Sequence, residues 1–226
     1  MDEVNCKLVL VGDSQCGKTA LIQRFITDNF TEVYSPTGFE RYTASYEVSD
    51  YRINFTLWDT SGASAYDTVR PLSYQDAKVF LLCFHICHSN SLDNTVNKWC
   101  PEVRQHSPNV PIILCGCQSD LRTDRETLCD LGKGKKSPVT SEQVGYEYIR
   151  ILALAVSRQI GATTYVETSS KSCSRSVRDA FEVAALAALG KLNKNHVTRP
   201  YLKVNCMSKI DLKDELREKA RHCVVM

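Results

Sequence analysis

The sequence predicts an α/β fold, with a mostly parallel sheet covered by helices on both faces. Short apolar runs alternate along the chain with segments that have helical patterns. These runs are apolar at nearly every position, which is typical of strands buried on both faces. With 226 residues, the chain can form one domain of ordinary size and a short tail.

Six segments are expected to form the strands of this sheet. They are residues 6–11, 41–48, 52–58, 78–85, 111–115 and 164–167. A turn near residues 49–51 joins the second segment to the third, so this hairpin should supply an antiparallel edge. Helices are expected at residues 17–27, 142–160 and 177–191.

The folded domain is expected to span residues 1–194. Within it, the polar stretch at about residues 122–140 contains the basic run GKGKK and is expected to be a surface insertion. Residues 195–226 are polar and of mixed charge, which is typical of a flexible, solvated tail.

The composition indicates a globular protein whose thiols are reduced. Apolar residues make up 43% and charged residues 24%, and the net charge of +2 excludes a strong field for nucleic acid. The start, MDEVNCKLVLVG, lacks the basic residues and the longer apolar stretch of a signal peptide. The eleven cysteines are therefore expected to be cytosolic, with no disulfide partner. The chain contains no apolar run of about 18 residues, so no membrane span is predicted.

A phosphate-binding loop is predicted between the first strand and the first helix. Residues 12–19 fit the pattern G-x-x-x-x-G-K-[ST] in full; they are Gly12, Asp13, Ser14, Gln15, Cys16, Gly17, Lys18 and Thr19, and Ala20 follows them. The glycines let the backbone wrap a phosphate, and amides at the helix start point at the anion. Lys18 is expected to reach the β- and γ-phosphates and Thr19 to bind Mg²⁺. The alternative is a chance match in a tight turn.

Three further segments carry a family resemblance. Residues 58–62 (WDTSG) resemble the W-D-T-A-G element of small GTPases, and residues 167–171 (ETSSK) resemble their E-x-S-A-K loop. Residues 33–40 (VYSPTGFE) resemble switch I of Rho proteins, and residues 70–74, 98–102 and 109–114 also match that branch. The resemblance covers residues 4 to about 193. It implies a P-loop NTPase small-GTPase fold with the Rho-type helical insertion, and GTP and Mg²⁺ as cofactors.

The resemblance also implies roles for residues outside the phosphate loop. Thr37 would be the second hydroxyl ligand of Mg²⁺, beside Thr19, and Asp59 would hold the ion through water. The Gly62 amide would sense the γ-phosphate. Further nucleotide contacts are expected from Phe30, Tyr34, Gln118, Asp120, Ser170 and Lys171.

The guanine base is expected to be recognised by Asp120. Its carboxylate can accept hydrogen bonds from N1–H and the exocyclic amino group together, a donor pair that adenine cannot offer. Cys117 is a poor hydrogen-bonding group where the family has Asn or Thr, so the stability of this loop is in question. Phe30 either stacks near the guanine edge or only packs at the end of a helix.

The departures from the family pattern concern hydrolysis. Ser14 replaces a glycine, Ser61 an alanine and Ala63 the glutamine that orients the attacking water. These changes together are similar to the Rnd subfamily of Rho proteins, in which GTP stays bound. Because phosphoryl transfer depends on positioning, losing that glutamine predicts negligible hydrolysis, and the chain has no expected catalytic residue.

Two other functions stay open. One is a slow, regulated GTPase that cycles with exchange and activating factors, which Ala63 and Ser14 disfavour. The other is a scaffold that works without nucleotide, which Cys117 and the extra length near residues 146–152 make conceivable. Retained Thr19, Thr37 and Asp59 fit a protein that stays loaded with GTP and a slow, cycling GTPase equally, because both need Mg²⁺ to hold GTP.

The resemblance implies effector proteins and a membrane as partners of a monomer. Effector contacts would come from switch I, through Tyr34, Pro36, Thr37, Phe39, Glu40 and Tyr42, and from switch II at residues 62–74. These effectors would control actin and adhesion. The last four residues, CVVM, fit C-a-a-X and predict farnesylation of Cys223. The expected location is the cytoplasmic face of a membrane such as the plasma membrane, with a cytosolic pool.

One segment exceeds the family length. Residues 143–159 exceed it by roughly nine residues, near 146–152, which would rotate the apolar face of a continuous helix by about half a turn. A bulge or a local break is therefore expected there.

Overall fold

The computed structural model describes residues 2–48, 50–123 and 142–192. The predicted insertion lies almost wholly outside these ranges. The predicted boundary at residue 194, the tail and Cys223 lie outside them as well.

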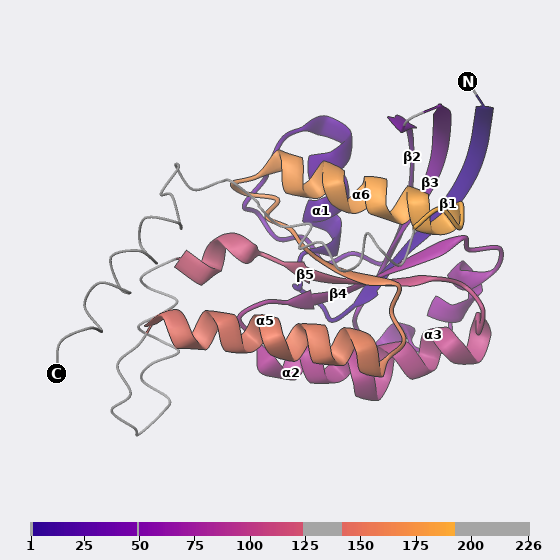
Figure 1. Ribbon diagram of the computed structural model, residues 1–226. Helices are drawn as coiled ribbons and strands as arrows, with labels where there is room; N and C mark the ends of the chain where they lie inside the picture. The colour runs from indigo at the N-terminus through magenta and orange to yellow at the C-terminus, as the bar shows by residue number, and fades with distance from the viewer. Residues whose placement is uncertain (1, 49, 124–141, 193–226) are drawn as a thin grey trace, which may run out of the picture.

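A six-stranded sheet forms the centre of the molecule (Figure 1). In chain order its strands are β1 (Asp2–Gly12), β2 (Phe39–Val48), β3 (Tyr51–Thr60), β4 (Val79–His85), β5 (Ile112–Cys117) and β6 (Thr164–Glu167). Their order across the sheet is β2-β3-β1-β4-β5-β6. Only the β2–β3 pair is antiparallel, and it lies at one edge. The predicted fold class and edge hairpin are confirmed.

Strand β1 begins earlier than its apolar run. Its first residues, Asp2 to Asn5, pair with residues 51–54 of β3 although three of the four are polar. Backbone pairing needs no apolar side chain, so the hydrophobic pattern marks only the part of a strand that is buried.

Helices cover both faces of the sheet, as predicted. Figure 1 shows α1 (Lys18–Thr27) and α6 (Ser174–Ala188) on one face, and α2 (Ser89–Asn94), α3 (Cys100–His106) and α5 (Glu142–Gln159) on the other. A π-helical segment at Thr95–Trp99 joins α2 to α3. None of the helices in the described ranges is long and apolar enough to cross a membrane.

Strand β1 contributes to two apolar cores. Leu8 and Leu10 pack with residues of α1 and α6, whereas Val9 and Val11 pack with residues of α3 and α5. All four side chains are fully buried. A strand between two helical layers must be apolar at every position, which explains the uninterrupted run in the sequence.

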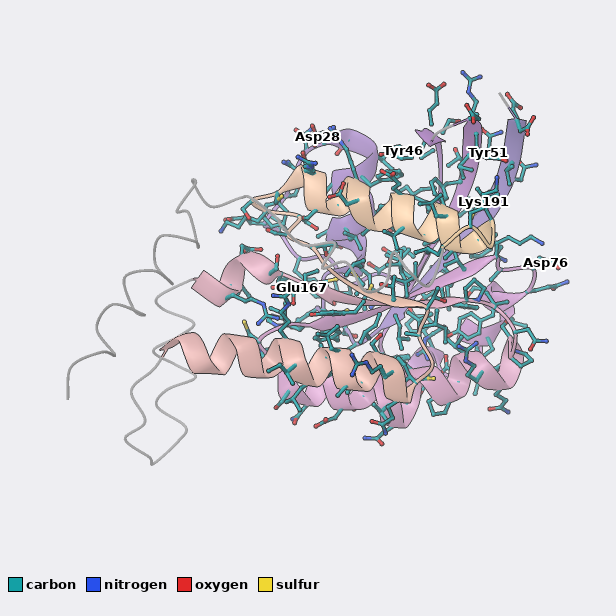
Figure 2. All side chains as sticks on the ribbon, viewed as in Figure 1. Asp28, Tyr46, Tyr51, Asp76, Glu167 and Lys191 are labelled. Carbon is teal, nitrogen blue, oxygen red and sulfur yellow. The ribbon has the colours of Figure 1, made fainter. Side chains whose placement is uncertain are left out.

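The ends of α6 are fixed to neighbouring elements. Arg178 pairs with Asp28 at the end of α1, with 3.1 Å between Nη2 and Oδ2. Beyond α6, the Lys191 ammonium lies over the ring of Tyr51 on β3, 4.0 Å from its centre (Figure 2). The Arg178–Asp28 pair is about half exposed, so it adds little to what the apolar face of α6 provides.

The expected break in the 142–160 region is wrong. Helix α5 runs without interruption from Glu142 to Gln159. Ala153 is fully buried, but Ile151 and Leu154 are 56% and 40% exposed. The apolar side chains of α5 therefore do not all face the core. The helix keeps its backbone hydrogen bonds, and two apolar side chains are exposed as a result.

The topology fixes where a ligand can bind. The strand sequence reverses at β1, with β3 on one side and β4 on the other. In open sheets of this kind, ligands bind at this switch point, beyond the carboxyl ends of the strands. The predicted phosphate loop follows β1 at that position.

Candidate nucleotide-binding site

A cleft of about 1120 Å³ lies at the switch point. Its walls come from the loop after β1, residues 30–38, the loop after β3, and the ends of β4 and β5. It brings together most of the predicted residues: Asp13, Ser14, Gln15, Gly17, Lys18, Thr19, Ala20, Phe30, Tyr34, Thr37, Gly62, Gln118, Asp120, Ser170 and Lys171. Gly12, Cys16 and Asp59 are buried and do not line the cleft. The Cys16 side chain belongs to the core, so only its backbone could serve a ligand.

The phosphate loop closes tightly around one ammonium group. The Lys18 side chain is 6% exposed, and its Nζ donates to the carbonyl oxygens of Gly12 and Asp13 at 2.8 Å each. Gly12 has a φ of 151°, and a Cβ there would lie 2.1 Å from the carbonyl oxygen of Cys83. Only glycine allows the backbone to come this close to Cys83, so the shape of the loop requires glycine at position 12.

Two hydroxyls and one carboxylate converge beside Lys18. Thr19 Oγ1 lies 2.8 Å from Thr37 Oγ1 and 2.6 Å from Asp59 Oδ2. Asp59 is fully buried, and its Oδ1 has no hydrogen-bond partner among the described residues. Burial raises the pKa of Asp59 to about 6. An oxygen-only group with an unsatisfied buried carboxylate atom fits Mg²⁺, which would be held by Thr19 and Thr37 with Asp59 behind them.

The loop after β5 is held by polar contacts beside Cys117. Gln118 has a φ of 63°, and its Nε2 donates to the carbonyl oxygen of Gln15 at 3.0 Å. Cys117 is 2% exposed and packs against Gly17. A Cβ added to Gly17 would lie 3.1 Å from the Cβ of Cys117. Cys117 therefore fills space, and Gln118 ties this loop to the phosphate loop.

Asp120 lies at the far end of the same loop. Its Oδ1 accepts a hydrogen bond from Ser169 Oγ at 2.5 Å. Arg122 pairs with Glu167 at the end of β6, with 2.8 Å between Nη2 and Oε1. The loops after β5 and β6 therefore form one wall, and Asp120 lines the cleft from it.

The predicted effector residues form an exposed rim. Tyr34, Pro36, Phe39 and Glu40 are exposed, while Thr37 and Tyr42 are half-buried. Phe39 contacts Tyr66 edge to face at 5.5 Å, which joins the rim to the segment after β3. In that segment Leu72 is 77% exposed, so the two segments share one partly apolar surface.

A buried guanidinium holds the segment after β3. Arg70 is fully buried, and its Nε and Nη2 donate to the carbonyl oxygens of Ser61 at 2.8 Å and Ala63 at 3.0 Å. Its Nη1 contacts both oxygens of Glu102, at 2.8 and 3.0 Å. The guanidinium also lies over the Trp99 ring, 4.7 Å from its centre. The sequence matches at 70–74 and 98–102 gave no sign of this link.

The same tryptophan reaches the phosphate loop. Trp99 Nε1 donates to Asp13 Oδ1 at 2.8 Å, and Asn94 Nδ2 donates to Asp13 Oδ2 at 2.9 Å. Asp13 is therefore a support of the loop as well as part of the cleft wall. Its partners lie more than 80 residues away, so the loop motif alone could not reveal them.

Comparison with known proteins fits this geometry. Residues 7–189 match the model of the Ras family. The chain belongs to this family. The Rho-related GTP-binding proteins RhoE of Homo sapiens, Mus musculus and Sus scrofa are each 48% identical to it over 192 residues. These matches cover 85% of this chain and 75% of each relative, which supports the Rho branch and a Rnd-like member. As a small GTPase, the chain binds a guanine nucleotide.

In this small GTPase, Gly62 is packed against the phosphate loop. A Cβ on Gly62 would lie 2.2 Å from the amide nitrogen of Ser14 and 2.5 Å from the carbonyl oxygen of Gly12. These are backbone atoms that cannot move aside without reshaping the loop. Gly62→Ala should therefore displace the amide at this position.

We expect Gly62→Ala to weaken GTP binding by about 10- to 100-fold, the value of one charge-assisted hydrogen bond, and to leave GDP binding unchanged. Equilibrium titration with fluorescent GTP and GDP measures the ratio. Gly38→Ala is the matched control, because its Cβ would meet Tyr66 Oη at an ordinary 3.5 Å. Equal losses for both nucleotides would contradict the role given to the Gly62 amide.

A histidine pair on the cleft wall makes stability depend on pH. The rings of His85 and His88 stack at 3.9 Å, and His85 Nδ1 accepts a hydrogen bond from the Cys87 amide at 3.1 Å. Burial, followed by the neighbouring His88, lowers the pKa of His85 to about 4. The ordinary pKa of histidine in the unfolded chain is about 6.5. Between about pH 4 and pH 6.5, His85 therefore binds fewer protons in the folded protein than in the unfolded chain.

We expect the contribution of His85 to the free energy of unfolding to fall as pH falls from about 6.5 to about 4, whereas the contribution of Asp59, whose pKa is raised, changes in the opposite direction. His85→Asn, which keeps an acceptor for the Cys87 amide, should flatten this dependence. Urea unfolding at several pH values measures it, with exposed His106→Asn as the control. An unchanged slope in His85→Asn would contradict the prediction.

Proposed function

We propose that this chain is a Rho-type signalling protein that stays bound to GTP and hydrolyses it very slowly. It presents switch I and switch II to effectors that control actin and adhesion. The observation that carries the proposal is Ala63, which stands where a water-orienting glutamine would be needed. Its side chain is a methyl group, its amide donates to Ser61 Oγ at 3.3 Å, and its carbonyl accepts from Arg70.

Nearby polar groups are poorly suited to replace that glutamine. Ser61 is 5% exposed, and its hydroxyl accepts the hydrogen bond of the Ala63 amide. Arg70 is fully buried and donates to carbonyl and carboxylate oxygens. A slow reaction follows, because phosphoryl transfer depends on groups that position the attacking water.

Ser14 supports the same proposal from the other side of the cleft. It is exposed on the cleft wall, and its backbone touches the Gly62 position. A side chain there narrows the space through which an activating protein would insert an arginine. Loss of such an arginine removes a factor of about 10³–10⁵ in rate.

Membrane attachment is part of the proposal and rests on the last four residues, CVVM. A farnesyl group on Cys223 would give reversible binding to the cytoplasmic face of a membrane such as the plasma membrane. Detergent partition of the full chain from cells tests it. Partition equal to that of Cys223→Ser would contradict it.

The nucleotide content of the full chain, purified in Mg²⁺, tests the GTP-bound state. We expect chromatography of the released nucleotide to show GTP with little GDP. Mainly GDP would overturn the proposal in favour of a slow, cycling GTPase. A chain without nucleotide would overturn it in favour of a scaffold.

A further inference from the structure

Three buried thiols meet behind the guanine side of the cleft. Cys83 on β4 faces Cys115 on β5 in the parallel register, and Cys117 follows two residues later on the same strand. The three side chains are 0%, 0% and 2% exposed. Their sulfur atoms all lie within 4.8 Å of one another, and Cys115 Sγ lies 3.9 Å from Cys117 Sγ.

These separations suit a metal ion. A metal–thiolate bond is about 2.3 Å long, so three sulfur atoms around one ion lie roughly 4 Å apart. The paired strands already hold the three residues at such spacings, so binding needs side-chain rotation and little backbone movement. The strands also prevent the thiols from moving apart.

The donor set selects the kind of ion. Within the described residues, this is the only group of three or more histidine, cysteine or acidic side chains close enough to share a metal. Sulfur donors alone favour soft ions such as Cu(I) or zinc. A structural zinc site takes four ligands, whereas the side-chain oxygen that contacts this group is the hydroxyl of Thr168, 3.6 Å from Cys115 Sγ. A hard hydroxyl is a poor fourth ligand, so a three-coordinate ion fits best.

We propose that Cys83, Cys115 and Cys117 form a three-sulfur site for one cuprous ion. Cys117 also lines the nucleotide cleft, so the proposed site borders that cleft. Each thiol that binds as thiolate releases one proton to the buffer, and copper stays Cu(I) throughout. The site is independent of whether GTP is hydrolysed.

Copper retention by the full, reduced chain tests the site. The chain is loaded with Cu(I) without oxygen and then challenged with the cuprous chelator bathocuproine disulfonate. We expect wild-type protein to retain one more ion per chain than Cys115→Ala or Cys83→Ala. X-ray absorption of the retained copper should show three sulfur atoms at about 2.3 Å.

Cys6→Ala is the matched control, because Cys6 is 2% exposed in the same core but lies outside the group. It should retain copper like the wild type. Nucleotide content and circular dichroism check that each variant is folded, and Cys115→Val replaces Cys115→Ala if the latter is not. Equal retention by the wild type and Cys115→Ala, or none by the wild type, would show that the thiols are only small core residues.

Discussion

Asp120→Asn is expected to weaken GTP binding by about 10⁴-fold and to give tighter binding of xanthosine triphosphate than of GTP. The aspartate accepts hydrogen bonds from two guanine donors. The NH₂ group of asparagine would instead face one of these guanine N–H groups, and two donors cannot form a hydrogen bond with each other. Xanthine carries an oxygen in place of the exocyclic amino group, so it offers the acceptor that asparagine needs.

The loop itself should survive this change. Ser169 Oγ donates to Asp120 Oδ1, and the amide oxygen of asparagine can accept the same hydrogen bond. Competition between the two triphosphates for a fluorescent nucleotide measures the preference. The xanthosine nucleotide is the internal control for folding. Wild-type affinity of Asp120→Asn for GTP would contradict the role of Asp120.

Arg70→Met is expected to lower the free energy of unfolding by about 3–5 kcal/mol. The change removes the cationic partner of Glu102, whose side chain is only 15% exposed and which keeps the hydrogen bond from the Tyr74 hydroxyl. It also leaves the carbonyl oxygens of Ser61 and Ala63 without the Arg70 donor. A buried charge that loses its partner costs far more than a surface ion pair contributes.

Arg52→Met is the matched control for this prediction. Arg70 pairs with the carboxylates of Asp67 and Glu102, and Arg52 likewise pairs with those of Glu3 and Glu47, but Arg52 is 48% exposed. Because it is exposed, its replacement should cost far less than that of Arg70. Urea unfolding with the same bound nucleotide measures both variants. Equal costs for Arg70 and Arg52 would show that the buried contacts contribute no more than the surface pairs.

Local patterns in the sequence predicted the parts of the fold that depend on neighbouring residues. The phosphate loop is contiguous, so its glycines, Lys18 and Thr19 could be placed from spacing alone. The strands could be placed because a layer between two sets of helices must be apolar throughout. The family resemblance then supplied Thr37, Asp59 and Asp120, which the structure places around the same cleft.

The rest depends on contacts between distant segments. Arg70 and Glu102, Asp13 and Trp99, and the three thiols are each joined by the fold and share no motif. The continuity of α5 was mispredicted because the apolar pattern was given more weight than the helical hydrogen bonds. Two exposed apolar side chains cost less here than breaking the helix.

Single-turnover hydrolysis of GTP in Mg²⁺ tests the central claim most directly. We expect the wild type to form no appreciable GDP over hours. Ala63→Gln combined with Ser14→Gly should react about 10²-fold faster, because it restores a group that orients water and opens the space beside Gly62. Hydrolysis by the wild type at an ordinary intrinsic rate of about 10⁻⁴ s⁻¹, unchanged in the double variant, would contradict the account.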